Sequence, residues 1–265
     1  MKIHYCWFGN SKKNELILRC IDSWRYFCPE AQIIEWNESN FDINICSYVR
    51  EAYEQKKWSF VSDYCRYYVL YHCGGIYLDT DVELIKGLQD LPETFAAFEV
   101  GGQLVASGLI RGAKKGDSIC KFMCSLYEHE RFTMNNGQFN LQTVCERETS
   151  IFLDRGLDLQ KNREIQIVDG TTIYPEDYFC PFDYLTGKLN KTKNTYSIHH
   201  YMGSWINSKD REIILLTRKL SSTTIPRRLA HDIAIVIKTI EYDRIYVTLK
   251  KVFKKTKEVW SRLKR

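Results

Sequence analysis

The stretch that most restricts the fold of this chain is HCGGIYLDTDV, residues 72–82. It follows residues 58–73, whose apolar spacing predicts a helix, and two glycines readily end a helix because left-handed backbone conformations cost them little. Residues 76–78 then predict a short buried strand. A helix that turns directly into a buried strand is typical of α/β proteins. This strand ends on two aspartates.

Strand and helix patterns alternate along most of the chain. Strands are predicted at 2–8, 32–36, 94–100, 103–112 and 163–170, and helices at 14–27, 44–55, 117–130 and 138–148. Residues 171–210 are aromatic and polar with weak periodicity. The alternation predicts an α/β fold with a mainly parallel central sheet flanked by helices. Such sheets bind ligands at the carboxyl ends of their strands, where Asp79 and Asp81 fall.

Charge divides the 265 residues unevenly. Residues 227–265 hold 12 Lys/Arg and 4 Asp/Glu, which leaves 26 Lys/Arg and 29 Asp/Glu for residues 1–226. The body is therefore nearly neutral and the tail is strongly basic, which indicates an anionic partner for the tail. We predict one domain over residues 1–222 and a basic amphipathic helical tail over 223–265.

The start of the chain, MKIHYCWFGN, has no long apolar core, so we expect no secretory signal. The ten cysteines are then expected to be reduced and mostly buried in a cytoplasmic protein. They form no Cys-x-x-Cys pair, which argues against a zinc site. No apolar run approaches the roughly 20 residues of a membrane span.

Asp79 and Asp81 flank one threonine. In an extended segment, residues i and i+2 point to the same side, so the two carboxylates would form an oxygen-rich site for Mg²⁺ or Mn²⁺. A cation in such a site commonly binds phosphate oxygens as well. The alternative for an isolated Asp-x-Asp is a solvated turn.

The helix before the glycines contains Ser-Asp-Tyr-Cys-Arg, which places Asp63 and Arg66 on one helical face. The whole stretch FVSDYCRYYVLYHCGGIYLDTDV resembles the sugar-binding region of glycosyltransferase family 32, which includes bacterial capsule and O-antigen transferases and the catalytic domains of clostridial toxins. WFG at 7–9 and HHYMGSW at 199–205 resemble two further segments of that family, in the same order.

The resemblance implies a GT-A fold, a divalent cation and a nucleotide-sugar donor. It further implies that Asp81 reaches the donor diphosphate through the cation, with Asp79 near the ribose or the cation. Asp63 would accept hydrogen bonds from the donor sugar, and Arg66 would bind a sugar hydroxyl or the diphosphate. These four residues are the candidate catalytic residues.

Other candidate residues have equally plausible structural roles. Trp7 could stack on uracil or fill the core, and Tyr77 could face the nucleotide or the core. His199 or His200 could be a third metal ligand, and because neighbours on an extended segment face opposite ways, only one is expected to point inward. The remaining candidates for donor binding are Ser204 and Trp205, on a segment that would close over the donor, and Ser107.

The sequence thus predicts a retaining, Mn²⁺- or Mg²⁺-dependent glycosyltransferase. The expected donor is a UDP-hexose, with galactose favoured. The expected acceptor is a glycan on a lipid-linked oligosaccharide of capsule or O-antigen synthesis. One alternative is an inactive homologue or a sugar-nucleotide-binding module docked on a membrane. Another is a HAD-type phosphohydrolase, whose nucleophile motif IYLDTDV matches in letters but which also needs a later acidic pair.

Apolar residues recur at helical spacing from Ile245 to Leu263, among the lysines of the tail. A basic amphipathic helix suits the surface of an anionic bilayer, so we expect the protein at the inner face of the cell membrane. The same stripe would also suit packing on the body or on another subunit. No nucleic-acid motif accompanies the tail, and no nucleic-acid partner is expected.

Overall fold

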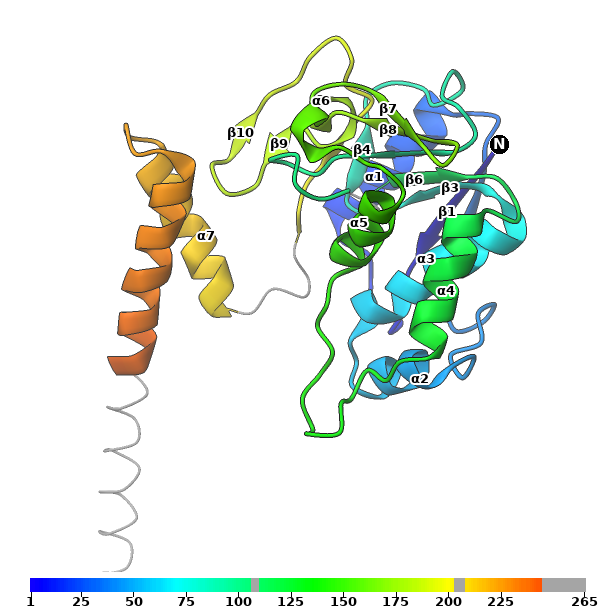
Figure 1. Cartoon of the computed structure of the whole chain (residues 1–265), viewed down its shortest axis with the longest axis horizontal. Coiled ribbons are helices and arrows are strands. Elements are labelled where there is room, and N and C mark those ends of the chain that lie inside the picture. Colours follow the sequence, from blue (N-terminus) through cyan, green and yellow to red (C-terminus); the bar gives the residue numbers. More distant parts are fainter. Residues whose placement is uncertain (106–109, 203–207, 245–265) are drawn as a thin grey trace, which may run out of the picture. The chain divides into compact units, whose positions relative to one another are not determined.

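The structure is a computed structural model that describes residues 1–105, 110–202 and 208–244 (Figure 1). Contacts divide the chain into two compact units. Unit 1 comprises Met1–Phe182 and Leu189–Ser204, and unit 2 comprises Asp183–Lys188 and Trp205–Arg265. The candidate site lies within unit 1.

The described elements alternate along unit 1 as an α/β protein requires. The strands are β1 (Lys2–Cys6), β2 (Gln32–Trp36), β3 (Gly75–Leu78), β4 (Val82–Leu84), β5 (Phe95–Ala97), β6 (Ile110–Ala113), β7 (Gln166–Val168), β8 (Thr171–Tyr174), β9 (Phe182–Asp183), β10 (Lys188–Leu189) and β11 (Ser197–His199). The helices are α1 (Glu15–Phe27), α2 (Ser47–Glu54), α3 (Trp58–Cys73), α4 (Ser118–Glu128), α5 (Val144–Asp154), α6 (Glu176–Phe179) and, in unit 2, α7 (Ser208–Ser221). A 3₁₀ turn lies at Leu159–Lys161.

Seven strands form the main sheet in the order β2-β1-β3-β6-β5-β8-β7. β1 pairs in parallel with β2 and β3, and β5 pairs in parallel with β8. β6 is antiparallel to both β3 and β5, and β7 is antiparallel to β8. Five strands (β1, β2, β3, β5 and β8) therefore run in one direction and two run in the other. The predicted fold class, α/β with a mainly parallel sheet, is confirmed.

The sheet separates two apolar cores. Residues of α2, α3, α4 and α5 bury their side chains in the first core, and residues of α1 and α6 bury theirs in the second. Strand β3 serves both, because Ile76 and Leu78 belong to the second core and Tyr77 belongs to the first. This alternation follows the two-residue repeat of a strand. Strand β3, which leads to the aspartates, is therefore held by packing on both faces of the sheet.

The turn from α3 into β3 depends on its two glycines. Gly74 has φ +62° and caps α3 through its N–H, which donates to the carbonyl of Leu70. Gly75 has φ +111°, and a Cβ there would lie 2.7 Å from the carbonyl oxygen of Lys2 on β1. Both positions exclude side chains. The close approach seats β3 directly beside β1.

The sequence located most elements but misplaced some. Helix α3 spans the predicted residues 58–73 and β2 spans 32–36. The helix predicted at 138–148 begins later, at Val144, because Thr143 and Glu146 form a capping box there. The strand predicted at 103–112 is a strand only from Ile110 among its described residues. Residues 171–210, whose periodicity is too weak to predict elements, contain β8 to β11, α6 and the start of α7.

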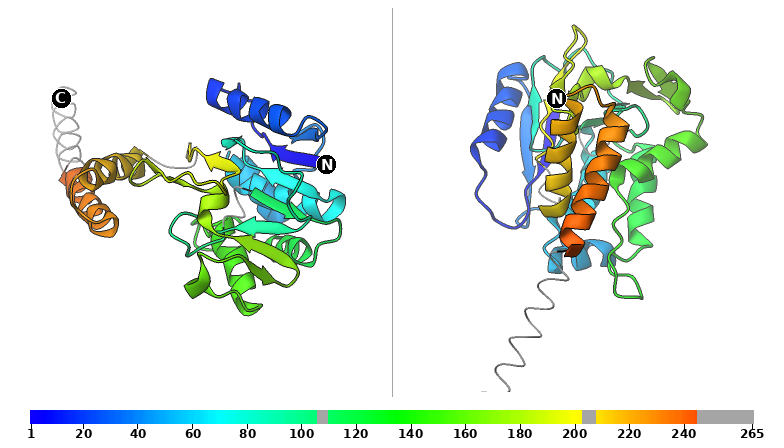
Figure 2. Two further views of the ribbon diagram at one scale, coloured as in Figure 1. Left: turned by 90° about the horizontal axis from the view of Figure 1, so that it is seen from above. Right: turned by 90° about the vertical axis from the view of Figure 1, so that its left-hand side faces the viewer.

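Unit 2 pairs α7 with a second helical segment, residues 227–244 (Figure 2). Lys238 forms an ion pair with Glu212, and the Tyr242 hydroxyl donates to the same carboxylate. Thr217 and His231 lie 3.2 Å apart in the middle of the pair. Helix α7, which the predicted boundary at 222 places in the first domain, thus groups with the segment that follows it.

Among the described residues, no helix is long and apolar enough to cross a bilayer. The apolar stripe predicted between Ile245 and Leu263 lies outside the described residues. The predicted division of the chain into a domain over residues 1–222 and a tail over 223–265 stays a prediction.

Candidate functional site

Asp79 and Asp81 lie in a tight turn that joins β3 to β4. The Val82 N–H donates to the Asp79 carbonyl across 3.0 Å and closes this turn. The extended geometry that we expected for these residues is therefore wrong. A turn still brings the two carboxylates together, because it folds the chain back within four residues. Side-chain exposure is 28% for Asp79 and 13% for Asp81.

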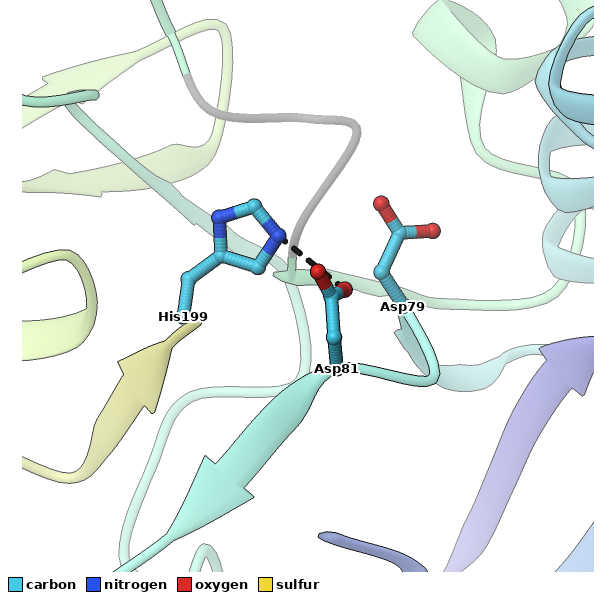
Figure 3. A group of neighbouring side chains, drawn as sticks. All are labelled: Asp79, Asp81 and His199. Carbon is cyan, nitrogen blue, oxygen red and sulfur yellow. Dashed lines mark hydrogen bonds and ion pairs between the residues drawn. The ribbon is translucent and has the colours of Figure 1, made fainter. Parts of the chain in front are cut away.

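His199 completes a three-residue cluster with the two aspartates (Figure 3). One ligand atom from each side chain lies within 4.8 Å of the others. The histidine arrives because β11 pairs antiparallel with β4, with His199 opposite Val82. Its ring nitrogen Nε2 lies 3.1 Å from Oδ1 of Asp81. The structure thus brings together three residues that the sequence separates into two distant motifs.

The residues after β11 surround Asp81. Besides the His199 contact, the Met202 N–H donates to Oδ2 across 2.8 Å. The His200 N–H donates to the Asp81 backbone carbonyl across 3.0 Å. Burial alone would raise the pKa of the Asp81 carboxyl, but His199 and the Met202 N–H outweigh it and lower that pKa to about 2. Asp81 is therefore ionised at any physiological pH.

The contact between Asp81 and His199 shifts the pKa of the imidazole upwards. Burial would lower the pKa of His199, but the negative charge of Asp81 and its hydrogen bond raise that pKa above 6.5. Asp79 adds to the effect. The two carboxylates therefore stabilise a proton on His199, and a cation that binds this cluster must displace that proton.

His200 lies on the other face of the β4–β11 pair. Its Nε2 is 2.7 Å from Oε2 of Glu83, which also pairs with Arg19 at 3.4 Å. The two histidines thus point in opposite directions, as expected for neighbours on a strand. The structure places His199 in the cluster and His200 outside it.

Asp63 and Arg66 form a buried ion pair on α3, beside the turn. Nη2 of Arg66 lies 2.9 Å from Oδ1 of Asp63 and 3.6 Å from Oδ1 of Asp79. The guanidinium also lies over the ring of Tyr77, 4.7 Å from its centroid. Arg66 therefore links the helix motif to the aspartate turn. Tyr77 itself is only 1% exposed, and its hydroxyl donates to Asp79.

Burial dominates the ionisation of two carboxyls near Arg66. It raises the pKa of Asp63 to about 6, although Arg66 opposes the shift. It also raises the pKa of Asp79, again against Arg66. Among the three site aspartates, only Asp81 has a lowered pKa, because His199 is its direct partner.

Trp7 follows β1 at the same edge of the sheet as the aspartate turn. Its side chain is half-buried, its Nε1–H donates to the Ser11 carbonyl, and Lys13 lies 5.2 Å from its ring. The remaining three candidates, Ser107, Ser204 and Trp205, lie outside the described residues.

Three features of this site were not predicted from the sequence. The Met202 N–H is a backbone donor, and nothing in its side chain marks it. Glu83 was not predicted either: it lies in the middle of β4, just after the aspartate turn, and no motif of the sequence marks it. Tyr201 adopts φ +48°, an uncommon conformation that bends the chain around Asp81.

The donor set suits a divalent cation. Two carboxylates favour Mg²⁺ or Mn²⁺, and an imidazole is better tolerated by Mn²⁺. Nε2 of His199 faces the two carboxylates, so one nitrogen and two carboxylate groups converge on one point (Figure 3). The three side chains therefore fit a cation of this kind.

Comparison with known families identifies part of the chain. Residues 14–96 match the family described as a glycosyltransferase sugar-binding region containing a DXD motif. The match includes Asp63, Arg66 and both aspartates of the turn, whereas His199 lies outside it. This part of the chain is therefore similar to glycosyltransferase sugar-binding regions. The predicted enzyme class, a glycosyltransferase, is confirmed, as is the family resemblance of this stretch.

Three solved glycosyltransferase structures are similar to parts of this chain. The PaToxG glycosyltransferase is 21% identical with a TM-score of 0.37, over 45% of this chain and 57% of that chain. A glycosyltransferase involved in glycosylation of the major capsid of PBCV-1 is 12% identical with a TM-score of 0.42, over 76% and 94%. The galactosyltransferase LgtC, in complex with donor and acceptor sugar analogs, is 12% identical with a TM-score of 0.37, over 85% and 98%. No protein of curated function matches the sequence.

Proposed function

We propose that this chain is a metal-dependent, retaining glycosyltransferase that transfers a hexose from a UDP-hexose to a glycan acceptor. The observation that carries the proposal is the junction of two charged groups of residues. The Asp79, Asp81 and His199 cluster offers ligands for a cation, and Arg66 joins it to the buried carboxylate of Asp63. One group suits a diphosphate through the cation, and the other suits the hydroxyls of a sugar.

Asp79, Asp81 and His199 would hold the cation, and we favour Mn²⁺ because of the imidazole. When bound there, the cation stabilises the negative charge that develops on the departing nucleoside diphosphate. The residues fix the geometry in advance: Tyr77 orients Asp79, and the Met202 N–H orients Asp81. Such preorganisation is the main contribution that a protein makes to charge stabilisation.

Asp63 and Arg66 would orient the donor sugar. A carboxylate accepts hydrogen bonds from hydroxyls, and the guanidinium offers several donors in one plane. Trp7 would supply a stacking surface for uracil, because its half-buried ring lies at the sheet edge that carries the aspartates. Tyr77 supports these groups from below, since its ring is buried under Arg66.

The family resemblance supports retention at the anomeric carbon by front-face transfer, in which the leaving phosphate helps to deprotonate the acceptor hydroxyl. We further propose UDP-galactose as the donor. The proposed acceptor is a lipid-linked oligosaccharide of capsule or O-antigen synthesis, because the basic tail suits a membrane surface.

The test is a screen of nucleotide sugars on the full-length protein for Mn²⁺-dependent hydrolysis and thermal stabilisation. We expect one UDP-hexose to stabilise the protein and to be hydrolysed or transferred only with Mn²⁺, and EDTA to abolish the reaction. Binding without turnover would instead indicate a sugar-nucleotide-binding module. Release of phosphate from a phosphate ester would indicate a phosphohydrolase.

Unit 2 supports attachment to an anionic membrane at the cytoplasmic face. The helical segment 227–244 buries Ala230 and Ala234. Beside these alanines it presents an apolar stripe at helical spacing, formed by Leu229, Ile233, Val236, Ile237 and Ile240. Four of these five are exposed, Val236 to 57%. The chain continues into residues 245–265, which hold eight Lys/Arg and one Glu. An apolar stripe joined to a basic segment suits an anionic bilayer.

Binding to phosphatidylglycerol-containing vesicles tests this attachment. We expect the full-length protein to bind, salt to weaken binding, and the double substitution Val236→Ser and Ile240→Ser to reduce it by about 10-fold. The matched control is Ile167→Ser, which alters an isoleucine of unit 1 that is 76% exposed. If the stripe variant becomes monomeric while vesicle binding is unchanged, the stripe binds a second copy of the chain instead.

A further inference from the structure

Glu83 and His200 form a polar contact directly beside the candidate cation cluster, on the opposite face of the β4–β11 pair. Their side chains meet at 2.7 Å, and they are 25% and 22% exposed. A neutral imidazole can make this contact by donating its Nε2–H to the carboxylate. Arg19 adds a weaker contact to Glu83 at 3.4 Å from a side chain that is 60% exposed. The family match and the proposed cation ligands assign no role to this contact.

The contact between Glu83 and His200 lies at the end of the short β4–β11 ladder. The β4–β11 ladder is only three residues long and ends at His199. Strand β4 is anchored to α1 on its other side: the Trp24 Nε1–H donates to the Val82 carbonyl, and the Leu84 N–H donates to Ser23 Oγ. The start of β11 is held on α6, because Ser197 Oγ–H donates to the Phe179 carbonyl and the Tyr196 N–H donates to the Tyr178 carbonyl. The end of β11, at His199 and His200, is held by its contacts with β4.

The chain immediately after the ladder is strained and carries functional contacts. Tyr201 adopts φ +48°, which costs a non-glycine residue on the order of 1 kcal/mol or more. This bend places the Met202 N–H on one oxygen of Asp81, while His199 contacts the other. Holding residue 200 in place therefore fixes both contacts, because His199 lies one residue before residue 200 and Met202 lies two residues after it.

We propose that Glu83 and His200 are positioning residues for the cation ligands. They hold the end of β11 on β4, so that His199 and the Met202 N–H keep the carboxylate of Asp81 in the orientation that a cation requires. Residues that orient metal ligands through a second contact change metal affinity by about 10- to 100-fold when they are lost. This inference rests on the proposed cation site.

The test is the dissociation constant of Mn²⁺ for the full-length protein without donor, measured from the EPR signal of free Mn²⁺. We expect Glu83→Ala and His200→Ala each to weaken Mn²⁺ binding by about 10-fold or more. Glu83→Gln keeps an oxygen acceptor for His200 and is expected to restore affinity to within about 3-fold of the wild type. The bound Mn²⁺ spectrum should broaden in the alanine variants and resemble the wild type in Glu83→Gln.

The matched control is Ser23→Ala, which removes a hydrogen bond from the other side of β4. We expect it to lower thermal stability without changing the affinity for Mn²⁺. The inference is overturned if Glu83→Ala binds Mn²⁺ like the wild type, or if Ser23→Ala weakens binding as much as Glu83→Ala does. If Glu83→Ala does not fold, Glu83→Gln and His200→Gln are measured in its place. Both variants keep the contact, so the inference requires that they bind Mn²⁺ nearly as tightly as the wild type.

A further variant separates this inference from the proposed cation site. If His199→Ala leaves Mn²⁺ affinity unchanged, the cation site itself is wrong. If His199→Ala abolishes binding while Glu83→Ala has no effect, the site stands and only the positioning role fails.

Discussion

The hydroxyl of Tyr77 donates to Oδ1 of Asp79 across 3.0 Å, and the ring of the same tyrosine lies under the guanidinium of Arg66. One buried side chain therefore supports both the acidic turn and the basic group beside it. Tyr77 acts from the core, where its hydroxyl has a partner whose orientation matters for cation binding.

Tyr77→Phe should keep the ring and remove this hydrogen bond. We expect the free energy of unfolding to fall by about 1 kcal/mol and the affinity for Mn²⁺ to fall by about 10-fold, because Asp79 loses the donor that orients it. Chemical denaturation and Mn²⁺ titration measure the two effects. The control is Tyr64→Phe, which removes a hydrogen bond between α3 and Glu128 at the end of α4. Equal losses of Mn²⁺ affinity in both variants would refute the orienting role.

Asp81→Asn should abolish transfer while leaving the protein folded. It keeps the volume of the side chain but removes the charge that a cation requires. We expect a loss of activity of at least about 100-fold, no stabilisation by Mn²⁺, and a stability loss of at most about 2 kcal/mol at neutral pH. Asp22→Asn alters an exposed aspartate paired with Arg25 and should change neither property. Normal activity of the wild type in EDTA would contradict the metal role.

Asp63→Ala should impair recognition of the sugar more than recognition of the nucleotide. Turnover and discrimination between donor sugars are expected to fall by about 10-fold or more, because the carboxylate that accepts sugar hydroxyls is lost. The affinity for free UDP, measured by calorimetry, should change by less than about 3-fold. If UDP binding falls in parallel with turnover, Asp63 is a structural residue of α3.

The affinity for Mn²⁺ should rise with pH. His199 must lose a proton before it can bind a cation, and Asp81 raises the pKa of this imidazole above 6.5. Below that pKa the proton competes, so affinity should increase by up to about 10-fold per pH unit and level off above it. Asp81, with a pKa of about 2, is ionised throughout and contributes no slope.

Mn²⁺ titrations between about pH 6 and about pH 8.5 measure this dependence. His199→Gln supplies the control, because an amide does not titrate, and its weaker binding should vary little with pH. A wild-type profile as flat as that of His199→Gln would show that the imidazole is no ligand.

The sequence predicted the parts of the site whose signals are local. Asp63 and Arg66 lie on one helix, and the two glycines mark the turn that leads to the aspartates, so short-range patterns sufficed for them. The α/β class followed in the same way from the alternation of strong helix and strand patterns.

Short-range patterns do not predict which distant strands pair with each other. The choice between His199 and His200 depends on the register of β11 against β4, which the sequence of a three-residue strand does not encode alone. The capping box at Thr143 was legible in the sequence, and applying it would have placed the start of α5 correctly. The turn at Asp79 follows a run of strand-forming residues, so sequence patterns alone predict extended chain there.

The contact between Asp81 and His199 joins residues 118 positions apart. A ribosome that adds about 5–20 residues per second needs roughly 6–24 s to cover this interval, and during that time the acidic turn exists without its imidazole. Any nascent or truncated chain that ends before β11 therefore carries the glycosyltransferase signature of residues 14–96 but an incomplete cation site. The proposed cation site is therefore complete only after β11, the last described strand of unit 1, has been synthesised.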